Sequence, residues 1–250
     1  MSDNPMYKRT IHKHEVESRH LAEGVRSVRV YLPPDYQAWR SYPVVYCQDG
    51  EQFFNFGRIA THAQRLILED GWEPFVVVGV DVDNAQRTSE YTPDGERYLS
   101  YTRFFAEELI SWIESRYSVR DVPEHRVLAG DSLGGAVSVS LALAYPELFR
   151  NVISLSGAFY DVYLDQIRQA DSLADRKLWM IVGLQEKEFA TDRGTFDFVQ
   201  LNRDAVRLLK EKGASVRYEE KDGEHKWGFW QNELPAALAE FLGPASRKRD

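Results

Sequence analysis

Apolar and polar residues alternate along the first part of the chain and give way to continuous apolar runs further on. The segments Tyr7–Ser18 and Val25–Leu32 both alternate with the period of two that a half-buried strand requires, and Gly24 lies between them. We expect these segments to pair as an antiparallel hairpin. Runs that are apolar throughout predict strands buried on both faces, as in a parallel sheet. The apolar runs are Val44–Cys47, Phe75–Val80, Val127–Ala129, Val152–Leu155 and Leu178–Val182. A more polar segment, Ser215–Glu220, is predicted as the last strand.

Segments with apolar residues three and four positions apart lie between these runs and predict helices. In Tyr98–Tyr117, for example, Phe105, Leu109 and Trp112 share one helical face. Strands that alternate with helices predict an α/β fold, with a mainly parallel central sheet, helices on both faces and the antiparallel hairpin at one edge. No repeat or linker interrupts the pattern, so we expect residues 1–250 to form a single domain. The other helical segments are Phe56–Asp70, 133–145, Asp161–Ala170, Phe198–Lys212 and Trp227–Leu242.

The sequence Gly130-Asp131-Ser132-Leu133-Gly134 lies between a predicted strand and a predicted helix. In this context the pattern G-x-S-x-G is typical of a nucleophilic serine on a sharp turn, where glycines two residues away leave room for the strained backbone. The alternative is a glycine-rich turn without chemistry. The helix that begins after Ser132 would direct its free N–H groups toward a developing oxyanion.

A serine nucleophile needs a base and a carboxylate that orients it. Of six histidines, His225 follows the last predicted strand and precedes the last helix, which places it at the carboxyl end of the sheet with Ser132. We therefore predict His225 as the base. The acid should follow the strand Leu178–Val182, where three carboxylates compete. Glu186 is our first choice because it is nearest the strand end, and Glu188 and Asp192 remain open.

The oxyanion requires two backbone N–H groups. We assign one to Leu133, directly after the nucleophile, and the other to Glu51, because Gly50 permits close approach of the backbone after the strand Val44–Cys47. Gln52 is the next choice for that amide.

Composition and charge narrow the class of partner. The 250 residues carry a net charge of −8, which disfavours binding to nucleic acid or to an anionic membrane. The single cysteine, Cys47, excludes an internal disulfide and a multi-cysteine metal site. No apolar run approaches the length of a membrane span, and the first residues contain no apolar core of a signal peptide. We therefore expect a cytoplasmic protein. The basic tail Ser246–Asp250 is expected to lack regular structure.

Several segments together resemble the family called "putative esterase" within the α/β hydrolases. They are Tyr31–Tyr36, Tyr42–Tyr46, Asp49–Phe54, Arg87–Pro93, Gly130–Gly135 and Gly223–Trp227. The family includes enterochelin (siderophore trilactone) esterases, feruloyl esterase domains, S-formylglutathione hydrolases of the esterase D type and mycobacterial mycolyltransferases. The resemblance implies an α/β-hydrolase fold, with Ser132 as nucleophile, His225 as base, Glu186 as acid and the Glu51 amide in the oxyanion hole. Two features depart from the usual pattern: His225 follows Gly223-Glu224 rather than Gly-Gly, and the acid is often aspartate.

The sequence therefore predicts a carboxylic ester hydrolase that acts through an acyl-enzyme on a small-molecule ester, such as a siderophore trilactone, without a metal or cofactor. We expect Gln52, Arg87 and Trp227 to contact the substrate. Arg87 would suit an anionic or catecholate group, and a structural salt bridge is an equal alternative. The rival functions are an acyltransferase with the same triad and a non-catalytic binding protein. A homodimer is a further alternative to a monomer.

Overall fold

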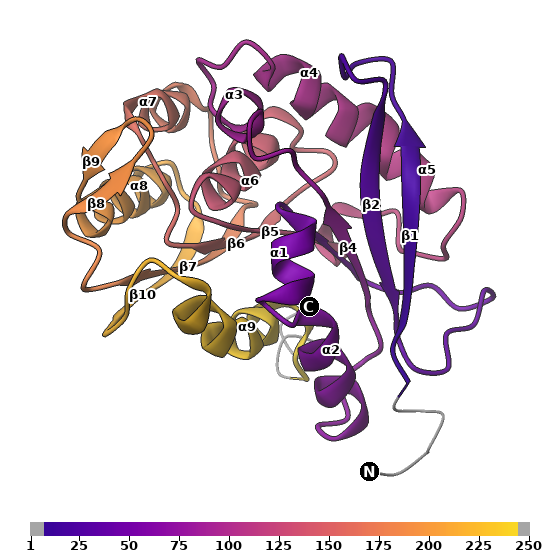
Figure 1. Ribbon diagram of the computed structural model, residues 1–250. Helices are drawn as coiled ribbons and strands as arrows, with labels where there is room; N and C mark the ends of the chain where they lie inside the picture. Colours follow the sequence, from indigo (N-terminus) through magenta and orange to yellow (C-terminus); the bar gives the residue numbers. More distant parts are fainter. Residues whose placement is uncertain (1–7, 245–250) are drawn as a thin grey trace.

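An eight-stranded β-sheet runs through the middle of the molecule in the computed structural model, which describes residues 8–244 (Figure 1). Its strand order is β1-β2-β4-β3-β5-β6-β7-β10, and β8 and β9 form a separate two-stranded hairpin. Tyr7 and the basic tail Ser246–Asp250 lie outside the described residues. The strands are β1 (Thr10–Glu17), β2 (Val25–Leu32), β3 (Val44–Cys47), β4 (Val76–Val80), β5 (Arg126–Asp131), β6 (Asn151–Leu155), β7 (Lys177–Gly183), β8 (Phe189–Thr191), β9 (Gly194–Phe196) and β10 (Ser215–Lys221).

The sheet is parallel from β4 to β10 and antiparallel at the edge formed by β1 and β2. Residues of β3 pair in parallel with β4 and β5, and the chain of parallel pairs continues through β6 and β7 to β10. At the other edge, Thr10 pairs with Leu32 across the hairpin, and Val28 pairs with Val80 of β4. The predicted α/β class and the N-terminal hairpin are confirmed.

Helices and helical turns connect these strands. Among residues 8–244, no helix has the length and apolar character needed to cross a bilayer. The helical elements are α1 (Gly50–Asn55), α2 (Ile59–Leu68), α3 (Arg87–Tyr91), α4 (Tyr98–Arg103), the π-helical turn η2 (Phe104–Leu109), α5 (Ile110–Glu114), the 3₁₀ turn η3 (Pro123–His125), α6 (Leu133–Ala144), α7 (Asp161–Gln169), α8 (Phe198–Glu211) and α9 (Trp227–Leu242).

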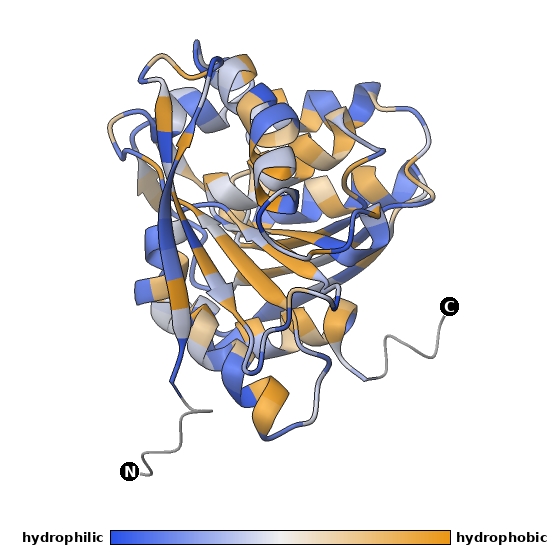
Figure 2. Cartoon of the chain, turned by 90° about the vertical axis from the view of Figure 1, so that its right-hand side faces the viewer, coloured by the Kyte–Doolittle hydropathy of each residue, from blue (hydrophilic) through white to orange (hydrophobic). Residues whose placement is uncertain are grey.

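The central strands are buried on both faces because a hydrophobic layer covers each side of the sheet. Along β3, Val44 and Tyr46 join a cluster that includes apolar residues of α6, α7 and α8, whereas Val45 and Cys47 join a second cluster with α2 and α9. Figure 1 shows α2 and α9 on one side of the sheet and α6 and α7 on the other. Hydrophobic residues are concentrated along the strands between these layers (Figure 2). The all-apolar runs of the sequence thus become strands with two buried faces.

Three short elements lie inside segments that the sequence pattern predicts as loops or leaves unassigned. These are α1, α3 and the β8–β9 hairpin, each too short to produce a visible hydrophobic period. The long predicted helix Tyr98–Tyr117 is present as α4, η2 and α5 in succession. The unpredicted elements matter because all three lie close to the carboxyl ends of the parallel strands, where the predicted catalytic residues also lie.

The Gly130 position offers a direct test of the packing between β5 and α6. A Cβ atom on Gly130 would lie 2.1 Å from the backbone carbonyl carbon and oxygen of Gly134, whereas a Cβ on Gly228 would meet nothing within 4 Å. We expect Gly130→Ala to lower the free energy of unfolding by at least ~2 kcal/mol, since backbone atoms cannot move aside cheaply. The control, Gly228→Ala, should stay within about 1 kcal/mol of wild type. Urea unfolding measures both, and equal stability of the two variants would contradict the described approach of helix and strand.

Candidate active site

Ser132 occupies a strained backbone conformation at the junction of β5 and α6. Its φ and ψ angles are 53° and −123°, a region that residues with a side chain rarely adopt and that costs about 1–3 kcal/mol. Hydrogen bonds hold the turn on both sides: the Ser132 N–H donates to the Leu155 carbonyl at 2.9 Å, and its carbonyl accepts from the Ala158 N–H at 2.9 Å. The end of strand β6 and the loop that follows it thus fix the position of the serine.

Glu186 and His225 form a direct hydrogen bond. Oε2 of Glu186 lies 2.6 Å from Nδ1 of His225, and both side chains are almost completely buried. The other oxygen, Oε1, accepts from the Gly183 N–H at 2.8 Å and from the Ser156 hydroxyl at 2.7 Å. Because both carboxylate oxygens are engaged, the carboxylate is fixed in orientation. Its bond to His225 uses Nδ1 and therefore does not occupy Nε2.

Three aromatic rings surround His225. Phe189, Phe198 and Trp230 lie with ring centroids 4.2, 4.4 and 4.8 Å from the imidazole. The Trp230 indole N–H donates to the Ser156 hydroxyl at 2.8 Å, and that hydroxyl in turn donates to Glu186. The place of Ser156 and Trp230 in this arrangement has no signal in the sequence, because a supporting chain of hydrogen bonds forms no linear motif.

Phe189 connects this pair with Ser132. The phenyl ring contacts His225 and also lines a cavity of about 260 Å³ that Ser132 and Leu133 line as well. Ser132, Glu186 and His225 follow β5, β7 and β10, which run parallel, so all three lie at the same end of the sheet. The cavity is lined by Asn84, Arg87, Thr88, Ser132, Leu133, Tyr160, Phe189, Thr191 and Asp192.

The two other candidate acids lie elsewhere. Glu188 is exposed on the loop after β7. Asp192 is also exposed, and its Oδ2 accepts a hydrogen bond from the Thr88 hydroxyl at 2.7 Å. Of the three carboxylates that the sequence left open, Glu186 is the one that contacts His225.

The amides assigned to the oxyanion hole begin two helices. Leu133 is the first residue of α6, and Glu51 is the second residue of α1, so neither N–H has a partner within its own helix. A Cβ on Gly50 would lie 2.4 Å from the Gly79 backbone, which explains why α1 can start so close to β4. The Glu51 side chain points away to an ion pair with Arg29 at 3.0 Å.

The residues expected to contact substrate are largely engaged with other protein groups. The Trp227 indole N–H donates to Oε1 of Gln52 at 3.1 Å. Arg87 forms a bidentate ion pair with buried Asp49, at 2.7 Å from Nε and 2.8 Å from Nη2. Arg87 also lines the cavity beside Ser132, so it combines the salt bridge with a place at the site.

A second buried carboxylate, Asp131, lies next to this ion pair. Burial, together with repulsion from Asp49, raises the pKa of Asp131 to about 7. Its Oδ1 atom has no hydrogen-bond partner among residues 8–244. The Arg87 guanidinium donates to the Asp131 carbonyl at 3.3 Å and partly offsets the repulsion.

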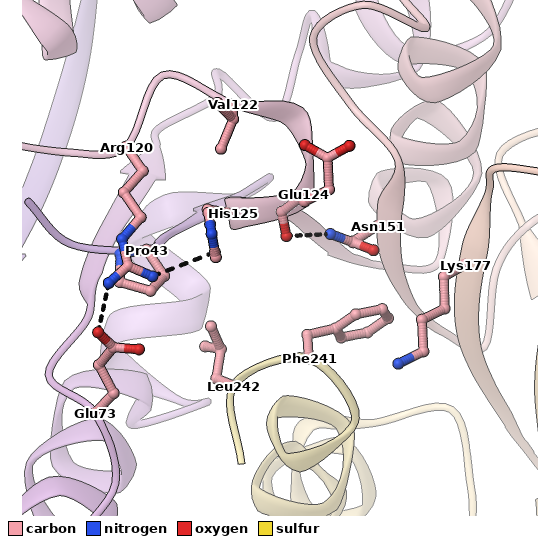
Figure 3. Close-up of a pocket in the computed structure, with 10 residues that line it drawn as sticks. All are labelled: Pro43, Glu73, Arg120, Val122, Glu124, His125, Asn151, Lys177, Phe241 and Leu242. Atoms are coloured by element: carbon pink, nitrogen blue, oxygen red, sulfur yellow. Dashed lines mark hydrogen bonds and ion pairs between the residues drawn. The ribbon is translucent and has the colours of Figure 1, made fainter. Parts of the chain in front are cut away.

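A different cavity, of about 370 Å³, lies at the opposite end of the sheet (Figure 3). His125, Asn151 and Lys177 line it from the amino ends of β5, β6 and β7. Its charged groups pair with their neighbours: Arg120 with Glu73, and Lys177 with Glu240. The described residues around it include no serine, threonine or cysteine, so it offers no hydroxyl or thiol nucleophile.

Comparison with known proteins decides the family. The model of the family described as "Putative esterase" matches residues 19–241, most of the chain. The chain belongs to this family. It is a carboxylic ester hydrolase, and its substrate is a small-molecule ester. The resemblance found in the sequence is confirmed.

Individual relatives agree with this placement. The uncharacterized protein YjcH of Bacillus subtilis is 32% identical over 235 residues, which cover 93% of this chain and 98% of that protein. An acetyl esterase of Caldicellulosiruptor saccharolyticus is 27% identical over 186 residues, covering 63% of this chain and 69% of the relative. The solved structure of enterochelin esterase from Shigella flexneri superimposes with a TM-score of 0.80 at 20% identity and shows the same fold. That match covers 94% of this chain and 59% of the esterase.

The raised pKa of Asp131 predicts a pH dependence of stability. A carboxyl group that binds its proton more tightly in the folded state contributes stability that is lost as pH rises from about 4 to about 7. Asp131→Asn removes this loss. The difference in free energy of unfolding between Asp131→Asn and wild type should shift by ~1–3 kcal/mol in favour of the variant from pH 5 to pH 8. Urea unfolding at both pH values measures it. The same difference between the two proteins at both pH values would refute the electrostatic origin.

Proposed function

We propose that ester hydrolysis in this protein proceeds through a triad of Ser132, His225 and Glu186 and a covalent acyl-enzyme. The observation that carries the proposal is the 2.6 Å hydrogen bond between Glu186 and His225, at the same end of the sheet as the strained Ser132. Phe189 supports it, since the ring touches the imidazole and lines the cavity beside the serine. A buried carboxylate, a histidine and a serine on a sharp turn are the three parts that this chemistry requires.

In the first half of the reaction, the Ser132 hydroxyl oxygen attacks the acyl carbon of the ester while its proton passes to Nε2 of His225. The carbonyl π electrons move to oxygen, and the N–H groups of Leu133 and Glu51 donate to this oxyanion. The intermediate then collapses: the C–O bond to the alcohol breaks, and His225 returns its proton to the leaving oxygen. The acyl group remains on Ser132.

In the second half, a water molecule takes the place of the alcohol. His225 accepts a proton from the water as its oxygen attacks the acyl carbon, and the same amides stabilise the second oxyanion. Collapse releases the carboxylic acid, and the proton on His225 restores the Ser132 hydroxyl. Throughout, Glu186 keeps the imidazole in the tautomer that leaves Nε2 facing the serine, and it stabilises the imidazolium when that forms.

The acyl group is proposed to be short. The cavity beside Ser132 has a volume of about 260 Å³, and the relative from Caldicellulosiruptor saccharolyticus is named an acetyl esterase. A siderophore trilactone was the sequence-based expectation, and the likeness to enterochelin esterase extends to the fold. A panel of acetyl, butyryl, feruloyl and trilactone esters distinguishes these substrates.

Removing the nucleophile tests the core of the proposal. We expect Ser132→Ala to lower kcat for the best ester of the panel by at least about 10³-fold, because no other group takes the covalent role. Steady-state hydrolysis of 4-nitrophenyl acetate and of the esters in the panel provides the measurement. An alanine variant as active as wild type would exclude the acyl-enzyme mechanism.

The choice of acid is tested by replacing one carboxylate oxygen. Glu186→Gln should lower kcat by about 10²–10⁴-fold with little change in KM, since the amide cannot stabilise the imidazolium. Glu188→Gln, on the same loop but exposed, is the matched control and should match wild type. If the two variants behave alike, Glu186 is not the orienting acid.

A further inference from the structure

The β8–β9 hairpin forms one wall of the cavity beside Ser132. Phe189 and Thr191 from β8, and Asp192 from the turn, line this cavity together with Thr88 of α3. The hairpin is fixed across the site at two points. The Thr88 hydroxyl donates to Oδ2 of Asp192 at 2.7 Å, and the Arg193 guanidinium forms a bidentate ion pair with Asp94 at 2.6 and 3.1 Å.

An aromatic contact supports the base of the hairpin. The rings of Phe196 and Tyr160 lie 4.5 Å apart, and Tyr160 also lines the cavity. The hairpin therefore holds its turn residues at a defined place relative to Ser132. Asp192, one of the three candidates for the triad acid, lines the cavity beside Ser132, whereas Glu186 contacts His225.

The charges of the cavity do not balance. Arg87, the positively charged residue in its lining, donates from Nε and Nη2 to Asp49, so its charge is already matched by a buried carboxylate. Arg193 is similarly matched by Asp94. Asp192 accepts a hydrogen bond from a neutral hydroxyl, that of Thr88. The remaining polar lining groups, Asn84, Tyr160 and Thr191, are uncharged.

We infer that the cavity selects short esters whose groups near the reacting carbonyl are uncharged or cationic, and that Asp192 determines this selectivity by repelling anionic groups. The inference rests on the proposed function of Ser132 and deepens it. A carboxylate held beside the site raises the energy of a bound anion and lowers that of a bound cation, and the effect falls with ionic strength. Uncharged and quaternary ammonium alcohols, esterified with short acids, form the class that fits.

The test uses esters that differ in charge at constant shape. One set of acetate esters carries its head group in the alcohol: acetylcholine, 3,3-dimethylbutyl acetate and 2-acetoxyethanesulfonate. A second set of 4-nitrophenyl esters carries it in the acyl chain: the esters of 4-(trimethylammonio)butanoic, 5,5-dimethylhexanoic and 4-sulfobutanoic acids. Each head group has four heavy atoms, so size is matched. We measure kcat/KM for wild type, Asp192→Asn and Asp171→Asn at low and high salt.

Wild type should cleave the cationic and neutral esters faster than the anionic ester in at least one set, mainly through KM. Asp192→Asn keeps an oxygen acceptor for Thr88 and removes the charge, so the cation-to-anion ratio of kcat/KM should fall by at least about threefold at low salt. Asp171→Asn removes an exposed charge outside the cavity lining and should leave the ratio unchanged.

Two results separate the possible failures. If Asp192→Asn has the wild-type ratio in both sets, or if wild type prefers the anionic esters, the selectivity assigned to Asp192 is wrong while the triad still stands. If Ser132→Ala cleaves the neutral esters as fast as wild type, the proposed function itself fails, and the selectivity inference with it.

Discussion

The positive φ angle of Ser132 is the constraint on which the rest of the site depends. A serine can hold φ 53° only where the surroundings make every other conformation worse. Here Leu155 at the end of β6 accepts from the serine N–H, and Ala158 in the following loop donates to the serine carbonyl. Close packing of Gly130 against Gly134 brings α6 down onto β5 and leaves no room for a Cβ atom. The strain therefore places a hydroxyl above the sheet, with the first amides of a helix behind it.

The parallel sheet brings the other groups to the same place. Glu186 and His225 are 39 residues apart, yet they meet because β7 and β10 are neighbours and both loops leave at the carboxyl ends. The buried carboxylate has its charge satisfied by three hydrogen-bond donors, from Gly183, Ser156 and His225. Such a fully satisfied network is rigid, so it fixes the orientation of the imidazole. Trp230 closes the network from α9 and couples the last helix to the acid.

The sequence predicted most of the regular fold, because each central strand contains an apolar run and helices such as α2, α7 and α8 have a clear hydrophobic period. It also placed Ser132 and His225 at one end of the sheet. Ser132 lies in a local motif, and His225 directly follows the last predicted strand. Glu186 remained one of three alternatives, because the turn of a loop decides which carboxylate points inward. The β8–β9 hairpin could not be predicted: its strands are only three residues long and are held by contacts with distant residues such as Thr88 and Asp94. Arg87 shows the same limit, as its partner Asp49 lies 38 residues away.

The proposed mechanism depends on activation of Ser132 by His225, and covalent labelling measures this activation most directly. Wild type and His225→Ala are incubated with a small fluorophosphonate, and peptide mass spectrometry locates the adduct and follows its rate of formation. We expect one adduct per chain, on Ser132, that forms at least about 10²-fold more slowly without the imidazole. An adduct on another residue, or a rate unchanged in His225→Ala, would contradict it.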